Sequence, residues 1–265
     1  MSDQDPVQLF DAADSEMEAA GAKARETFKY FWRELSWERR RIVPGLDLAC
    51  VKVAFAVEQP VDGQPSVEHM WVDDVDFNGR QISGTLVNSP NWINSVSEGD
   101  EVKVTLDELV DWMFAIRGKV YGGFTVNVMR SRMSPSDRRE HDKAWDLDFG
   151  DSTTVCLVYF EPSKSGAHHD QEVAARRDHP MSLNMEASLR QALDNNPEMV
   201  NERDERAWTM LHREALAGNR NIVQVLLEYG ADPDLTTPEG RTPLDLARAL
   251  NWDETVEVLS KRPMQ

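Results

Sequence analysis

Apolar residues recur at helical spacing near the start of the chain. Between residues 24 and 41 they fall at i, i+3, i+4 and i+7, as Phe28, Phe31, Trp32 and Leu35. This spacing predicts one stripe of an amphipathic helix that begins at about Ala22 and packs on a sheet. The basic triplet Arg39-Arg40-Arg41 follows, and we expect it to lie in solvent at the helix end. Binding of the triplet to an acidic group is the alternative.

Alternation of apolar and polar residues in the next part of the chain predicts short antiparallel strands. Four segments alternate clearly: residues 46–57, 67–76, 80–88 and 101–106. Among the turn signals between them, Asn78-Gly79 is the strongest, because tight hairpins need positive φ angles. We also expect three further elements: one helical turn at 107–113, a strand or hairpin limb at 114–120, and a last strand at 153–160.

Residues 124–133 fit either a strand or a helix, because different apolar residues among them satisfy each period. Ser134-Pro135-Ser136-Asp137 is typical of a helix start, so a helix is predicted from there to Trp145.

Several motifs in order carry a family resemblance: Glu68-His69-Met70-Trp71-Val72, Gly84-Thr85-Leu86-Val87-Asn88-Ser89-Pro90, Gly99-Asp100, Asp111-Trp112-Met113 and Gly122-Gly123-Phe124-Thr125. With these motifs the chain resembles the bacterial domain of unknown function 2314 over about residues 23–150. The resemblance implies no established activity.

The last third contains a repeat. Thr209-Met210-Leu211-His212 returns 33 residues later as Thr242-Pro243-Leu244-Asp245, and with Gly230-Ala231-Asp232 it resembles ankyrin repeats over about residues 183–262. Three residues depart from the usual pattern: Met210, Glu214 and Asp245. About two and a half repeats are near the minimum for stability, so we expect the array to lean on the preceding domain or on a partner.

Pattern and composition divide the chain into four predicted parts. Residues 1–21 form an acidic flexible arm, and residues 22–160 an α+β domain in which a helix packs on a curved antiparallel sheet of five to seven short strands. Residues 161–182 form a linker, and residues 183–262 an all-α ankyrin array.

Composition and charge exclude several classes of function. The chain of 265 residues has a formal net charge of -18, which repels nucleic acid and anionic membranes and favours a basic protein partner. Solubility alone is another reason for such a charge. There is no apolar run of membrane-spanning length and no signal-peptide start. Cys50 and Cys156 are expected to be buried thiols of a cytoplasmic protein.

Candidate chemistry centres on His69 and Asp73, which share a face of one predicted strand. With Asp111 they could form an acid/base cluster, and this is the enzyme alternative. We favour hydrogen bonds from His69 and Asp111 to buried backbone or tryptophans. His168, His169, Asp170 and His179 could bind a divalent metal, but linker histidines usually bind nothing specific. We therefore expect no catalytic, cofactor-binding or metal residues, and no cofactor.

Tryptophans suggest where a partner binds. Trp71 and Trp112 are expected in the core, whereas Trp92 could be either core or an exposed anchor. The protein-binding residues that we predict are Trp92, Trp208, Arg241 and Trp252. The predicted function is that of a cytosolic protein-binding protein, an immunity-type inhibitor of a basic toxin or effector. A general scaffold or regulatory protein and an enzyme using His69 with Asp73 or Asp111 are the alternatives.

Overall fold

The computed structural model of the chain describes residues 14–58, 60, 65–159 and 178–261. The chain divides into two compact units. The first comprises Met1–Thr27 and Gly45–Cys156, and the second comprises Phe28–Pro44 and Leu157–Gln265. The long helix α1 (Ser15–Glu38) therefore contributes its first part to one unit and its second part to the other.

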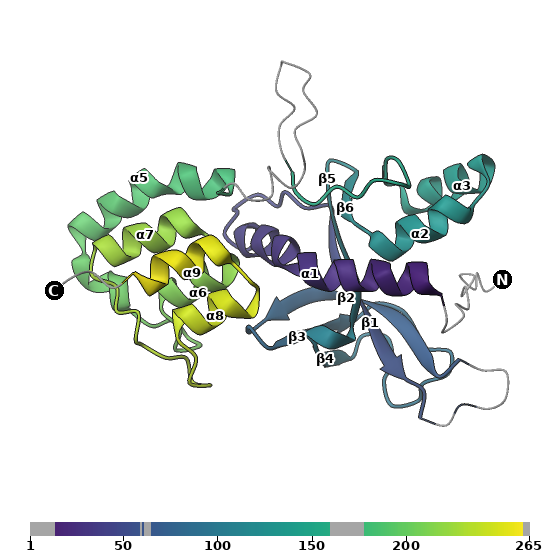
Figure 1. Cartoon of the computed structure of the whole chain (residues 1–265), viewed down its shortest axis with the longest axis horizontal. Helices are drawn as coiled ribbons and strands as arrows, with labels where there is room; N and C mark the ends of the chain where they lie inside the picture. Colours follow the sequence, from purple (N-terminus) through teal and green to yellow (C-terminus); the bar gives the residue numbers. More distant parts are fainter. Residues whose placement is uncertain (1–13, 59, 61–64, 160–177, 262–265) are drawn as a thin grey trace, which may run out of the picture. The chain divides into compact units, whose positions relative to one another are not determined.

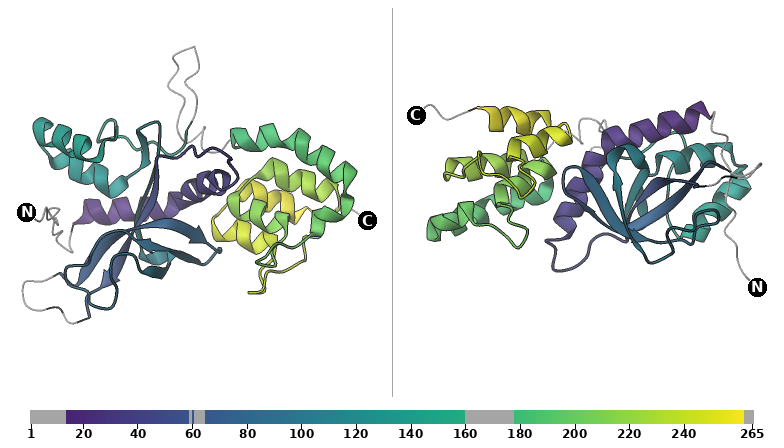
Figure 2. Two further views of the ribbon diagram at one scale, coloured as in Figure 1. Left: turned by 180° about the vertical axis from the view of Figure 1, so that it is seen from behind. Right: turned by 90° about the horizontal axis from the view of Figure 1, so that it is seen from below.

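Six antiparallel strands form the sheet of the first unit, in the order β4-β3-β2-β1-β5-β6 (Figure 1). They are β1 (Leu48–Ala56), β2 (Val67–Phe77), β3 (Gln81–Leu86), β4 (Glu101–Thr105), β5 (Leu109–Ile116) and β6 (Lys119–Gly122). β1 pairs with both β2 and β5. The expected α+β class is confirmed, and Figure 2 shows the strands twisting within one layer.

Helices pack on both faces of this sheet. Val51 and Trp112 are register partners on one face, where the indole Nε1 of Trp112 donates to the carbonyl of Ala24 in α1 at 3.0 Å. Lys52 and Asp111 are register partners on the other face, which is covered in part by α2 (Phe124–Arg132) and α3 (Pro135–Trp145). Because successive side chains of β1 and β5 point to opposite faces, each helix layer contacts a different set of strand side chains.

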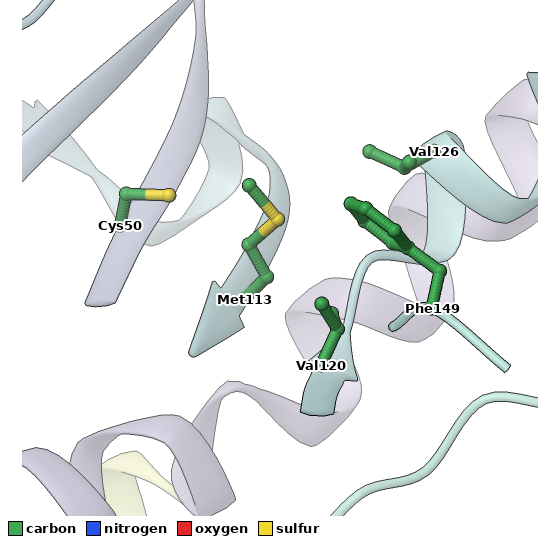
Figure 3. Packing of buried hydrophobic residues seen from close by; sticks show 5 residues of the cluster. All are labelled: Cys50, Met113, Val120, Val126 and Phe149. Carbon is green, nitrogen blue, oxygen red and sulfur yellow. The ribbon is translucent and has the colours of Figure 1, made fainter. Parts of the chain in front are cut away.

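A compact apolar cluster joins the second face to its helices. Cys50 and Met113 point from β1 and β5 toward Val126 of α2 and toward Phe149, with Val120 of β6 beside them (Figure 3). Burial of apolar area at about 25 cal/mol per Å² is what holds this helix layer on the sheet. Cys50 is buried and Cys156 half-buried, and both are free thiols.

Helix α1 begins at Ser15, earlier than the expected start at about Ala22. The carboxylate of Asp14 accepts the backbone N–H groups of Glu16 and Met17, so it caps the helix end. Of the arm predicted over residues 1–21, residues 1–13 lie outside the described part, and the rest includes the first turn of α1.

Helix α2 resolves the ambiguity of residues 124–133. Gly122 and Gly123 precede it with positive φ angles, and a Cβ atom at Gly122 would lie 2.2 Å from the carbonyl oxygen of Trp112. Only glycine allows this approach, so β6 ends there and the chain turns into a helix. The helix predicted from Ser134 to Trp145 is confirmed as α3, with Ser134 as its N-cap.

Three local predictions need correction. The helical turn expected at 107–113 is only a 3₁₀ turn at Leu106–Glu108, capped by Thr105, and β5 takes the remaining residues. The limb expected at 114–120 is split between β5 and β6 by a turn at Arg117 and Gly118. Of the strand expected at 153–160, the described residues 153–159 form none, and the carbonyl of Cys156 accepts a single hydrogen bond from the N–H of Gly122 at the end of β6.

The second unit contains stacked pairs of helices (Figure 2). Its helices after α1 are α5 (Pro180–Asn195), the 3₁₀ turn η2 (Pro197–Asn201), α6 (Met210–Ala217), α7 (Arg220–Glu228), α8 (Pro243–Ala249) and α9 (Asp253–Ser260). The all-α array is confirmed. Residues 161–177 of the predicted linker lie outside the described part, so the linker and the domain boundaries stay predictions.

Asp245, one of the departures from the repeat pattern, is explained by its capping box. The hydroxyl of Thr242 donates to the carboxylate of Asp245 at 2.8 Å, and the backbone N–H of Asp245 returns a bond to that hydroxyl. Thr209 and His212 form the equivalent box one repeat earlier. A carboxylate therefore caps α8 in place of an imidazole, and the helix start is preserved.

Candidate functional site

The first candidate is a buried polar group between the sheet and α2. Lys52 of β1 and Asp111 of β5 are cross-strand neighbours, and both are buried. The Lys52 ammonium donates to the hydroxyl of Thr125 at 3.2 Å, and that hydroxyl donates to Asp111 at 2.6 Å. The cation and the anion are thus joined through a threonine at the start of α2.

The carboxylate of Asp111 caps the N-terminus of α2. It accepts the backbone N–H groups of Phe124 at 2.9 Å, Thr125 at 2.7 Å and Val126 at 3.4 Å, besides the hydroxyl of Thr125. Helix ends leave these N–H groups without partners, and the helix dipole favours a negative charge there. Because both carboxylate oxygens are occupied, Asp111 is placed to hold a helix. The expected hydrogen bonding of Asp111 to buried backbone is confirmed.

Burial shifts the pKa values of both charged side chains in this group. Desolvation raises the pKa of Asp111, opposed first by the positive charge of Lys52. Desolvation also lowers the pKa of Lys52, opposed by Asp111. The ring of Trp71 lies 4.7 Å from the Lys52 nitrogen and gives the cation a further favourable contact.

His69 does not join Asp73 or Asp111 in a catalytic arrangement. No hydrogen bond links it to either carboxylate in the part of the chain that the structure describes. Desolvation, and then the charge of Lys52, lowers the pKa of His69. Desolvation, and then Asp74, raises the pKa of Asp73. The chemistry of an acid/base pair therefore has no geometric support here.

Glu68 has a role that the sequence did not reveal. Its buried carboxylate accepts the backbone N–H and side-chain amide of Asn91 at 2.8 and 3.1 Å, and the backbone N–H of Trp92 at 3.0 Å. These three bonds hold the loop that carries Trp92. The Trp92 side chain is half-buried, and its predicted role in protein binding stays a prediction.

Trp208 and Trp252 are not exposed anchors. Each is only 8% exposed, and the indole Nε1 of Trp252 donates to the carbonyl of Leu216 at 3.0 Å. A Cβ atom at Gly218 would lie 2.1 Å from the Trp252 ring, so the glycine makes room for this packing. Both tryptophans are therefore packed inside the array. Arg241 is half-exposed, and its predicted role in protein binding stays a prediction.

The second part of α1 packs against the short loops within the repeats, which we name the loop edge: residues 218–219 and 251–252, together with His179 and Glu214. The indole of Trp37 donates to Asn219 at 3.1 Å. Arg40 pairs with Glu214 at 2.7 Å, and Asn219 donates to the same carboxylate at 2.7 Å. The expectation of a solvated Arg39-Arg40-Arg41 triplet is therefore wrong for Arg40, which pairs with a buried carboxylate. It is wrong for Arg41 as well, because this side chain pairs with the buried Glu34 at 2.9 Å.

These contacts run along the whole array. Lys29 donates to the carbonyl of Asn251 at 3.0 Å, and Tyr30 lies edge-on to Trp252 at 5.9 Å. At the other end, the ring of His179 stacks on Trp37 at 5.6 Å. Residues 29–41 therefore touch the last, middle and first helical pairs, and support the short array along its length.

Both ring nitrogens of His179 have hydrogen-bond partners within the protein. Its Nδ1 accepts the backbone N–H of Met181 at 3.1 Å, and its Nε2 lies 3.0 Å from a carboxylate oxygen of Glu34. The other residues of the metal alternative, His168, His169 and Asp170, lie outside the described part. Among the described residues no group of three or more His, Cys, Asp or Glu could hold a metal ion. Likewise, no described helix is long and apolar enough to cross a membrane.

The end of the array opposite the loop edge carries two longer connections between helices. We name these connections the fingers: residues 202–209 and 232–242. Their exposed acids outnumber their exposed bases, with Glu202, Glu205, Asp232, Asp234 and Glu239 against Arg203 and Arg206. Arg203 donates to the carbonyl of Thr236 at 2.9 Å and so ties one finger to the other. The fingers are an ordered acidic surface that the tryptophan pattern alone did not indicate.

Comparison with known proteins agrees with both predicted resemblances. The family described as uncharacterized protein conserved in bacteria (DUF2314) matches residues 14–149, and ankyrin repeats (many copies) match residues 192–247. A protein of Neisseria meningitidis serogroup B, named as an ankyrin repeat protein, is 44% identical over 256 residues, which cover 97% of both chains.

Two proteins of Escherichia coli match one part each. The uncharacterized protein YegJ is 33% identical over 73 residues, which are 28% of this chain and 48% of YegJ. The protein YahD, named as an ankyrin repeat protein, is 42% identical over 66 residues, which are 23% of this chain and 32% of YahD.

Proposed function

Because the chain belongs to the bacterial DUF2314 family and carries ankyrin repeats, which indicate a role in protein interaction, we propose that it is an immunity-type inhibitor. In this proposal its partner is a basic toxin or effector, and the acidic surface covers the active-site cleft of that partner. The net charge of -18 supports attraction to such a partner at long range.

The observation that carries the proposal is the division of the array into a covered edge and an open end. Residues 29–41 already occupy the loop edge with Trp37 and Arg40. The fingers remain exposed and acidic. Their mutual bond through Arg203 means that little conformational entropy is lost when a partner binds.

Charge reversal on the fingers tests the proposal. Glu205→Lys with Glu239→Lys changes two exposed finger residues, whereas Glu228→Lys with Glu257→Lys makes the same change of net charge on α7 and α9. A partner is first identified by pull-down at low and high salt, and Kd is then measured for both variants. The finger variant should bind at least 10-fold more weakly, and the control within about 2-fold. Equal losses would mean that only net charge matters.

The alternatives differ in what the bound partner does. An immunity-type inhibitor abolishes the activity of its partner at one-to-one stoichiometry, whereas a scaffold or regulatory protein leaves a bound partner active. The enzyme alternative predicts turnover that His69→Ala removes from a folded protein. The occupied oxygens of Asp111 argue against that alternative.

A further inference from the structure

Part of the second face of the sheet carries no helix from the described residues of the first unit, and we name this part the open face. α2 and α3 cover the part formed by β1, β5 and β6, where Cys50 and Met113 are buried. On β4, by contrast, Glu101, Lys103 and Thr105 are exposed while Val102 and Val104 between them are buried on the opposite face. Among the described residues of the first unit, β3 and β4 therefore have no helix on this face, and α3 reaches β2 there through the contact of Trp145 with Trp71.

Apolar side chains gather on this open face beside Trp71. Val67 shares the face because it stands two pleats before Trp71 on β2. Val87 lies opposite Trp71, since its N–H donates to the carbonyl of Trp71 at 3.0 Å. Trp145 of α3 lies edge-on to Trp71 at 6.2 Å. Val67, Val87 and Trp145 are 39%, 45% and 39% exposed, and they are the exposed large apolar residues of the described first unit.

Trp145 is held in place by aromatic neighbours. Besides Trp71, the ring of Phe149 lies 6.2 Å away at a near-perpendicular angle, and that of His141 lies 6.4 Å away. The other seven tryptophans are buried or half-buried, so Trp145 alone among them is an exposed ring. A rigid exposed tryptophan is the kind of residue that dominates binding energy in protein interfaces.

Two of the nearby cations are used in internal pairs, whereas two nearby carboxylates are not. Lys52 is balanced by Asp111 through Thr125, and Lys103 pairs with Glu101 at 3.1 Å. Asp73 is half-exposed on the same face, and Asp146 is exposed directly after Trp145. Neither forms a salt bridge with any described residue. An arginine or lysine could therefore pair with them and stack on the tryptophan ring.

We infer that the open face, defined by Val67, Asp73, Val87, Trp145 and Asp146, is a docking surface for an apolar and basic segment of a protein partner. Its exposed valines and Trp145 would take the apolar side chains, and its two unpaired carboxylates the cations. The inference rests on the proposed function for the basic character of the partner. It adds a contact on the first unit that is independent of the fingers.

A peptide probe tests the surface without knowledge of the partner. The full chain is titrated with acetyl-Leu-Arg-Leu-Arg-Leu-amide at about 0.15 M salt, where the Debye length is ~8 Å and distant charges are screened. Kd comes from calorimetry, and backbone NMR shifts locate the site. The expected shifts fall on β2, the residues around Val87 and α3. Trp145→Ala and Val87→Ser should each weaken binding at least 5-fold, and the finger variant should not change it.

Matched controls make the result specific. Leu183→Ser removes another exposed apolar side chain, in the second unit, and should leave Kd unchanged. Peptides with Glu for Arg or Ser for Leu should bind at least 10-fold more weakly. Equal Kd values for wild type, Trp145→Ala and Val87→Ser would overturn the inference. So would a dimer that Val87→Ser dissociates, since the face would then be covered by a second copy.

Discussion

Arg40→Met provides a direct test of the loop edge. The substitution keeps most of the apolar stem and removes the cation that pairs with Glu214 at 2.7 Å. The carboxylate of Glu214 is only 2% exposed, and Asn219 would remain as its sole described partner. Removing one partner of a buried pair costs about 3–5 kcal/mol. Because the Arg40 side chain is 26% exposed, we expect a smaller cost of about 2–3 kcal/mol.

A surface pair of the same length is the matched control. Lys261 and Glu257 are also 2.7 Å apart, but they are 70% and 66% exposed. Lys261→Met should therefore cost less than about 0.5 kcal/mol. Glu214→Ala restores a small apolar residue at this repeat position, and Arg40→Met should cost little in that background. The expected coupling in the double-mutant cycle is at least about 1.5 kcal/mol.

Native-state hydrogen exchange of the α6 amides measures these free energies within the second unit, so unfolding of the first unit does not interfere. Additive effects of Arg40→Met and Glu214→Ala would refute the reasoning. Equal costs at Arg40 and Lys261 would do the same, because burial of the carboxylate would then have no consequence.

Three further predictions concern the array and the start of α1. A fragment of residues 181–265 lacks the supporting residues 29–41 and should melt well below the full chain by calorimetry; equal melting temperatures would show that the array stands alone. Gly218→Ala puts a methyl group into a tryptophan ring at positive φ and should cost at least about 2 kcal/mol in urea unfolding. Gly240→Ala has a similar φ but open space and should cost only about 1 kcal/mol. Hydrogen bonds from Arg132 lower the pKa of Asp14 from 3.8 to about 2, so this contribution to stability is present above pH 3.8 and is lost as the pH falls through about 2. In Arg132→Gln the NMR titration midpoint of Asp14 should rise toward 3.8, and an unchanged midpoint would contradict the pairing.

Sequence patterns predicted the elements whose signals are local. Alternation along residues 67–76 and 80–88, and the repeat from Thr209 to Thr242, depend on neighbours within a strand or a turn. For this reason the antiparallel sheet, the ankyrin array and helix α3 could all be predicted. The exact end of a strand was harder, because β6 ends where the backbone of Gly122 closely approaches Trp112 of the neighbouring strand β5.

Pairings between distant segments could not be read from the chain. The stripe of Phe28 and Trp32 marks a buried helix face but does not say which surface buries it, and the second part of α1 belongs with the array. In the same way, the sequence did not show that Arg40 pairs with the buried carboxylate of Glu214, or that Asp111 caps the N-terminus of α2. The sequence alone cannot show which charged side chains form ion pairs, because folding brings their partners from distant parts of the chain.

Exposure of the tryptophans was decided only by tertiary packing. The sequence determined that the chain has eight tryptophans, an acidic charge and two recognisable modules. It could not show that Gly218 makes room for Trp252, or that Trp71 and Phe149 hold Trp145 at the surface. Whether a tryptophan side chain is buried in the core or exposed to a partner depends on the residues that the fold places around it, and these include residues far away in the chain.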